Sequence, residues 1–176
     1  MLLAATARHQ VAGLLLNDVG PVLEKEGLLR IREYLGIEPG FGSFESAAAA
    51  MKRNLPGMVG LADAQWLAFA HRIFRNDNGI PRLSYDPRLA LTFPTEEQIR
   101  ASTGTELWPL FDSLDSLPLA VLHGENSDLL SSETVAEMKR RMPQLQATTI
   151  MGRAHVPFLD ELQSLEAISA WLDEVD

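Results

Sequence analysis

The chain has 176 residues, of which 46% are hydrophobic, and this is enough for one folded domain with an apolar core. Its 24 acidic and 15 basic residues give a net charge of −9, which disfavours binding to nucleic acid or to an anionic membrane surface. The chain has no cysteine, which excludes disulfides, thiolate catalysis and cysteine-ligated metals and fits a reducing cytoplasm.

The first residues, MLLAATARHQVAGLLL, lack the basic start and the apolar length of a signal peptide. No stretch approaches the roughly 18 consecutive apolar residues of a membrane span. We therefore expect a soluble, cytoplasmic protein.

Three short apolar runs predict buried β-strands, each followed by turn-forming residues. They extend from Val11 to Leu16, over 117–122 and over 147–151. Apolar residues at helical spacing, with capping residues and breakers at the ends, predict the helices. In chain order these are the tail of a helix in 2–7, then 24–36, 44–55, 62–75, 96–102, 106–114, a helix from Ser131 or Ser132 to Met142, and a last one over 162–175.

The segment NDNGIPRLSYDPRLALTFP, residues 76–94, is rich in Asn, Asp, Gly and Pro and indicates a long return loop. Residues 22–92 therefore resemble a helical module inserted into a core made of residues 1–21 and 93–176.

The order strand, helix, strand, helix at the end of the chain predicts an α/β fold with about three parallel strands and flanking helices. The strand from Val11 to Leu16 is so apolar that it is typical of the interior of a sheet rather than an edge. We expect another segment or a partner chain to lie beside it, or two copies of the chain to associate through it.

Two polar residues follow the second and third predicted strands and are candidates for a catalytic acid and base. Asp128 lies in LHGENSDLLS and His155 in MGRAHVP. Each alone is better explained as a turn or loop residue than as a catalytic one. Because neighbouring parallel strands end at the same edge of a sheet, we expect the two side chains to meet, the carboxylate orienting the imidazole as in hydrolytic triads. Asp18, in NDVGP after the first strand, is the alternative acid.

The remaining histidines and the serines give weaker signals. His123 ends the second strand and is a candidate for lining the pocket. His9 is expected in a turn between a helix and a strand, and His71 is expected to be a surface or packing residue. No histidine spacing suits zinc, and no glycine-rich phosphate loop is present, so neither a metal nor a cofactor is expected. No G-x-S-x-G motif occurs, and Ser43 suits the cap of the following helix.

In this order and spacing, VAGLLLNDVGP, YDPRLA, LHGENSDLLS and GRAHVPFLDE resemble the C-terminal portion of the α/β-hydrolase fold family, in its serine esterase and C–C bond hydrolase-like subgroup. The resemblance implies family strands 6 to 8, Asp128 as acid, His155 as base and residues 22–92 as a helical lid. It also implies that the nucleophile and the oxyanion hole precede Met1.

The resemblance leaves three functions open. The first is a truncated esterase-like hydrolase for a small apolar substrate, bound by Trp66 and Phe69 of the lid, and inactive without the missing segment. The second is a non-catalytic interaction module with the same partial fold. The third is a dehalogenase or epoxide hydrolase whose aspartate nucleophile lies in the missing part.

Overall fold

The computed structural model describes residues 1–101 and 107–175, and these form two compact units. The first unit consists of residues 1–28 and the described residues from 107 onward, and the second of residues 29–101. The second unit thus covers most of the segment expected as an inserted helical module. The expected helix ends at Ser102 and Glu106 lie outside the described residues.

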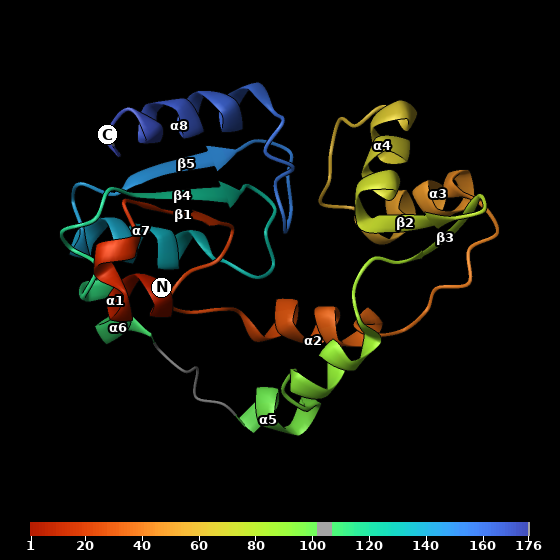
Figure 1. Ribbon diagram of the computed structural model, residues 1–176, viewed down its shortest axis with the longest axis horizontal. Coiled ribbons are helices and arrows are strands. Elements are labelled where there is room, and N and C mark those ends of the chain that lie inside the picture. Colours follow the sequence, from red (N-terminus) through yellow and green to blue (C-terminus); the bar gives the residue numbers. More distant parts are fainter. Residues whose placement is uncertain (102–106, 176) are drawn as a thin grey trace. The chain divides into compact units, whose positions relative to one another are not determined.

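A parallel three-stranded sheet forms the centre of the first unit (Figure 1). Its strands are β1 (Leu14–Asn17), β4 (Leu119–Gly124) and β5 (Gln146–Ile150), in the order β1-β4-β5. β1 pairs with β4 from Leu14↔Leu119 to Asn17↔Leu122, so the carboxyl ends of the strands lie at one edge of the sheet. The predicted α/β class with three parallel strands is confirmed.

β1 begins three residues later than the sequence suggested, because the chain before it turns. Residues Arg8–Gln10 form a 3₁₀ helix, and Gly13 lies directly against Trp171 and Val175. A Cβ at position 13 would come within 2.7 Å of Val175 and 2.9 Å of Trp171. This close approach fixes where the strand can start.

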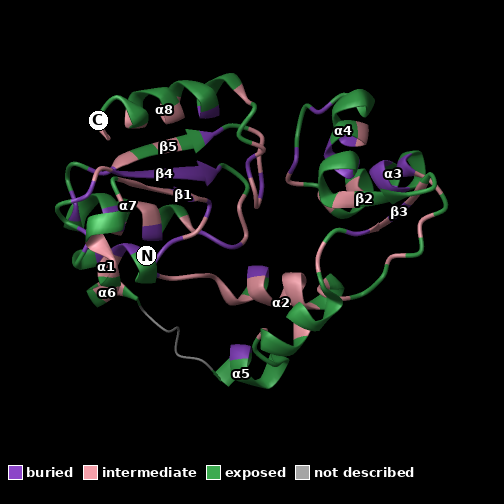
Figure 2. Cartoon of the chain, in the orientation of Figure 1, coloured by how far each residue is buried: buried purple, intermediate pink, exposed green. Residues whose placement is uncertain are grey.

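Helices cover the sheet and bury its apolar side chains. Leu119 and Val121 of β4 join a core cluster that draws on α1 (Leu2–Thr6), α6 (Trp108–Asp112) and α7 (Ser132–Arg141). Ala120 and Leu122 point to the other face because side chains alternate along a strand. There α8 (Leu162–Leu172) packs against β4 and β5. Every residue of β4 is buried, as Figure 2 shows.

The second unit is mostly helical. Its helices are α3 (Phe44–Asn54), α4 (Asp63–Ile73) and α5 (Glu96–Ala101), with a 3₁₀ helix over Pro87–Thr92, and α2 (Lys25–Tyr34) begins in the first unit and continues into the second. Ser43 caps α3 as expected, since its hydroxyl accepts a hydrogen bond from Ser46 N at 3.2 Å. α3 and α4 pack against each other.

The segment expected as a return loop contains a β-hairpin, so that expectation was wrong for its first half. β2 (Phe74–Asp77) pairs antiparallel with β3 (Ile80–Leu83) around Asn78 and Gly79. Both turn residues have positive φ, 51° and 88°, the conformation of a two-residue hairpin turn. The Asn-Gly pair is a hairpin signal, but the loop prediction counted it only among the turn-forming residues.

The hairpin turn gives a test of backbone strain. Gly79 and Gly42 both have open space where a Cβ would be added, but only Gly79 has a positive φ. Replacing Gly79 by Ala should therefore lower the free energy of unfolding by about 1 kcal/mol, and Gly42→Ala should leave it nearly unchanged. Urea unfolding of the two variants measures the difference, and equal stabilities would contradict the strained turn.

Candidate functional site

Asp18 and His155 are in contact at the carboxyl edge of the sheet. Asp18 directly follows β1, and its Oδ2 lies 2.8 Å from Nδ1 of His155, in the loop between β5 and α8. The Asp18 side chain is fully buried, and that of His155 is 18% exposed. Asp18 has a φ of 56°, in the left-handed region that Asp tolerates better than most residues. Asp18 therefore both makes the bend after β1 and contacts His155.

The Asp18 carboxylate accepts two further hydrogen bonds from the turn after β4. Gly124 N donates to Oδ1 at 2.8 Å, and Ser127 Oγ donates to Oδ2 at 2.6 Å. Ser127 Oγ also accepts from the backbone N–H groups of Leu129 and Leu130. Burying a carboxyl group is costly unless hydrogen-bond donors satisfy it, and these donors hold the Asp18 side chain in one orientation.

The contact assigns the tautomer of the imidazole. When Nδ1–H donates to the carboxylate, Nε2 keeps its lone pair and becomes the basic nitrogen. The carboxylate also stabilises the imidazolium that forms when Nε2 takes up a proton. The pair can therefore act as an oriented general base.

Gly124 allows the loop that carries His155 to approach the sheet. A Cβ at position 124 would lie 2.7 Å from the carbonyl oxygen of Ala154 and 2.8 Å from that of Arg153. Both are backbone atoms, so a larger residue would displace the loop. The glycine at the end of the predicted strand thus has a steric reason, which the sequence did not reveal.

Asp128, which the sequence favoured as the acid, lies in the turn after Ser127. Its carbonyl oxygen packs against Gly27 at the start of α2, and Glu24 N donates to the carbonyl of Leu129. The ring of His155 bonds to Asp18, the residue given as the alternative acid. Both aspartates follow a strand within a group of turn formers, and the sequence ranked Asp128 first only because its strand and the strand before His155 are consecutive along the chain.

The other candidate residues have different surroundings. His123 is buried, and its Nε2 lies 3.0 Å from the carbonyl oxygen of Leu130, a contact that satisfies the ring within the core. Trp66 and Phe69 lie on α4 of the second unit, both buried, with ring centroids 6.3 Å apart. A role of these three residues in substrate binding stays a prediction.

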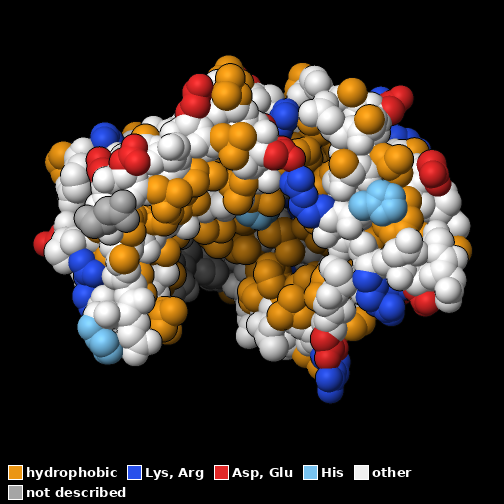
Figure 3. Space-filling model, turned by 45° about the horizontal axis from the view of Figure 1, so that its top comes forward, with side chains coloured by type: hydrophobic (Ala, Val, Ile, Leu, Met, Phe, Trp, Pro, Cys, Tyr) orange, Lys and Arg blue, Asp and Glu red, His pale blue; other side chains and the backbone are white. Residues whose placement is uncertain are grey.

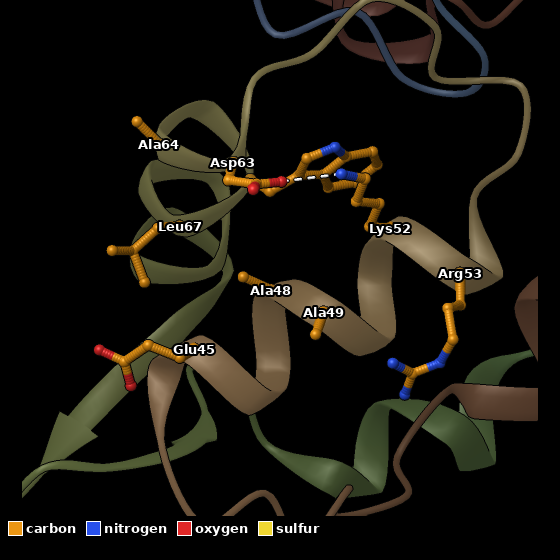
Figure 4. Close-up of a pocket in the computed structure, with 9 residues that line it drawn as sticks. Glu45, Ala48, Ala49, Lys52, Arg53, Asp63, Ala64 and Leu67 are labelled. Carbon is orange, nitrogen blue, oxygen red and sulfur yellow. Dashed lines mark hydrogen bonds and ion pairs between the residues drawn. The ribbon is translucent and has the colours of Figure 1, made fainter.

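A hollow of about 610 Å³ lies between α3 and α4 of the second unit (Figure 4). Ala48 and Ala49 of α3 and Ala64 and Leu67 of α4 supply much of its apolar wall, and Trp66 also lines it. At its rim Lys52 Nζ pairs with Asp63 Oδ1 at 2.7 Å. Glu45 and Arg53 also line it, so apolar and charged side chains both face this hollow.

The described parts of the chain contain neither a group of metal-binding side chains nor a membrane-spanning helix. Over residues 1–101 and 107–175 no three His, Asp or Glu side chains are grouped so that they could hold a metal ion. No helix in these ranges is long and apolar enough to cross a bilayer.

Solved structures share this architecture. An α/β hydrolase from Novosphingobium aromaticivorans superposes with a TM-score of 0.86 at 37% identity, over 98% of this chain and 60% of its own. This chain has a partial α/β-hydrolase fold. A putative hydrolase from Rickettsia typhi shares the fold with a TM-score of 0.77 at 20% identity, over 98% of this chain and 57% of its own.

A curated protein also matches this chain. A 3-hydroxybutyrate-oligomer hydrolase from Cupriavidus necator is 35% identical over 168 residues, which are 92% of this chain and 57% of that protein. The chain therefore spans well under two thirds of the length of these relatives. A scan against models of protein families finds no match.

Glu161 was not singled out from the sequence, yet it contacts both sides of the His155 loop. Burial raises the pKa of its carboxyl, but hydrogen bonds from Phe158 N–H, Ser164 and Arg153 outweigh burial and bring the pKa below its usual value of 4.5. A group with a lowered pKa in the folded state stabilises the fold above its unfolded pKa and loses this contribution as the pH falls through the folded value.

We expect Glu161→Gln to lower the free energy of unfolding at neutral pH, on the order of 3 kcal/mol, because it leaves Arg153 without its buried partner. The difference from the unmodified chain should shrink as the pH falls below 4.5, the usual value for Glu. Chemical unfolding at several pH values measures it, with Glu166→Gln, at an exposed position of the same helix, as control. A difference that does not depend on pH would contradict the assigned ionisation.

Proposed function

We propose that this chain is part of a hydrolase that acts by acyl transfer on an ester of a small substrate. His155 acts as the general base, Asp18 orients it, and a serine nucleophile comes from polypeptide outside these 176 residues. The observation that carries the proposal is the 2.8 Å contact between His155 Nδ1 and the buried Asp18 carboxylate, at the edge where parallel strands end.

The relatives support the reaction class. The matched proteins include an α/β hydrolase and a 3-hydroxybutyrate-oligomer hydrolase. Oligomers of a hydroxy acid are joined by ester bonds, and an activated serine is suited to cleaving these bonds. We propose esters of short hydroxy acids as the substrate class. Trp66 and Phe69 of the second unit are the residues proposed to bind the substrate.

Features of the first unit support an additional segment beside β1. β1 is an edge strand of the described sheet, although its sequence is as apolar as an interior strand. Asn17 Oδ1 is buried and has no hydrogen-bond partner among the described residues. Figure 3 shows hydrophobic side chains on the surface. The exposed large ones include Leu2 and Leu3 of α1 and Leu162 and Leu165 of α8.

A chimera tests the function and the choice of acid. In the Novosphingobium enzyme the matched segment is replaced by residues 1–176 of this chain, and hydrolysis of a nitrophenyl butyrate ester is measured. We expect an active chimera that a fluorophosphonate inactivates, whereas the 176-residue chain alone should give no turnover. Fluorophosphonate-sensitive turnover by the chain alone would place the nucleophile within these residues.

In the active chimera, Asp18→Asn should lower kcat by roughly 10³-fold or more, because the amide favours the wrong imidazole tautomer. Asp128→Asn, the matched control at the neighbouring turn, should change kcat by less than about threefold, and His155→Ala should abolish turnover. The reverse ranking of the two aspartates would return the acid role to Asp128.

A second candidate is an interaction module that pairs through β1, which the strand's open edge favours. The N–H groups of Leu14 and Asp18 bond to the carbonyls of Pro118 and Leu122. By alternation, those of Leu15 and Asn17 face the open edge.

We expect the isolated chain to self-associate through this strand, so that its sedimentation coefficient rises with concentration. Leu15→Pro removes a donor from the open edge without removing a bond to β4, and it should reduce association. A monomer at all concentrations would contradict association through β1.

A further inference from the structure

The loop from residue 152 to 158 carries His155 between β5 and α8, and backbone contacts anchor it to the sheet edge. Asn126 N donates to the carbonyl oxygen of Arg153 at 2.8 Å, and Gly152 N donates to Glu125 Oε2 at 2.8 Å. After His155, Asn17 Nδ2 donates to the carbonyl oxygen of Pro157 at 3.1 Å. These contacts hold the loop against its neighbours but do not join its two sides to each other.

One carboxylate oxygen joins the two sides. Glu161 Oε1 accepts from Arg153 Nε at 2.7 Å, two residues before His155, and from Phe158 N at 3.0 Å, three residues after it. Glu161 Oε2 accepts from Ser164 Oγ at 2.7 Å, which orients the carboxylate from α8. Arg153 also lies over the Phe158 ring, 5.5 Å from its centroid. Together these contacts link the two sides of the loop, so that the chain on either side of His155 is held through Glu161.

Two observations separate this carboxylate from an ordinary surface charge. The side chains of Arg153 and Glu161 are 12% and 9% exposed, whereas both partners of the Lys52–Asp63 ion pair are more than half exposed. Glu161 is also the N-cap residue of α8, yet its side chain caps none of the N–H groups of that helix. The carboxylate is directed at the His155 loop instead.

We propose that Glu161 is a positioning residue, which closes the loop through Arg153 and Phe158 and so holds His155 Nδ1 against Asp18. The inference rests on the proposed function only in taking His155 as the base. Gly152, with a φ of 67°, begins the loop and permits many backbone conformations. Without the link through Glu161, the loop would lose more conformational entropy each time His155 contacts Asp18. Buried ion pairs add little net stability, which agrees with a role in selecting one conformation.

The test measures the contact between His155 and Asp18 directly, by NMR of the 176-residue chain. Ring ¹⁵N shifts report which nitrogen carries the proton in the neutral imidazole, and the exchange of the Nδ1 proton with water reports how often the contact opens. Asp18→Asn removes the carboxylate that contacts Nδ1, so it shows how fast the Nδ1 proton exchanges when this acceptor is lost. Glu166→Gln, at an exposed position on the same helix, is the control.

In Glu161→Gln we expect proton exchange at His155 Nδ1 to accelerate about tenfold, and the Nδ1–H tautomer to lose population. Ser164→Ala removes one donor and leaves the pair with Arg153, so it should accelerate exchange about threefold and keep the fold. The control should match the unmodified chain.

A role limited to stability would lower the melting temperature of Glu161→Gln but leave exchange at His155 unchanged well below that temperature, and this result would overturn the proposal. If Glu161→Gln does not fold, Ser164→Ala decides, since unchanged exchange there also overturns it. The measurement needs neither nucleophile nor substrate. An inactive chimera combined with accelerated exchange would therefore refute the proposed function and leave the positioning role intact.

Discussion

The buried carboxylate of Asp18 is the constraint on which the functional edge of this protein depends. Removing a carboxylate from water is costly unless donors replace the water, and here two segments supply three contacts. The backbone N–H of Gly124 and the hydroxyl of Ser127 come from the end of β4 and the turn after it, and the ring of His155 comes from the loop before α8. The carboxylate at the end of β1 therefore joins three parts of the chain, and displacement of either donor segment would remove contacts from a buried group.

A second carboxylate acts on the same loop at a different level. Asp18 contacts the imidazole ring, whereas Glu161 contacts the backbone and the arginine on either side of it. Catalytic groups must be held within fractions of an ångström of their working geometry, and a side chain on a loop needs support from residues that do not react. Asp18 and Glu161 do not contact each other, but together they would give His155 this support, although His155 lies in a loop and not in a helix or strand.

The fold and the chemistry place different demands on this chain. Residues 1–28 and 107–175 form a unit around a three-stranded sheet, and the chain as a whole matches an α/β hydrolase at 37% identity over 98% of its residues. An oriented base alone does not hydrolyse an ester, because the reaction also needs a nucleophile and donors for the oxyanion. Under the proposed function, a further segment beside the apolar edge strand β1 would supply both.

The sequence by itself determined the elements whose signals are local. Apolar runs bounded by turn formers located the three strands to within about three residues, and Ser43 and Ser131 marked the starts of α3 and α7 because a hydroxyl cap is a local interaction. The Asn-Gly hairpin signal is also local, but the expectation of a return loop did not use it. Contacts between distant residues were not accessible in this way.

Asp18 and Asp128 have equivalent surroundings along the chain, and only the register of β1 on β4, together with the positive φ of Asp18, decided which carboxylate contacts His155. Glu161 acts through groups that become its neighbours only when the loop folds back on α8. These choices belong to the tertiary structure because a hydrogen bond depends on distance in space, which the order of residues does not contain.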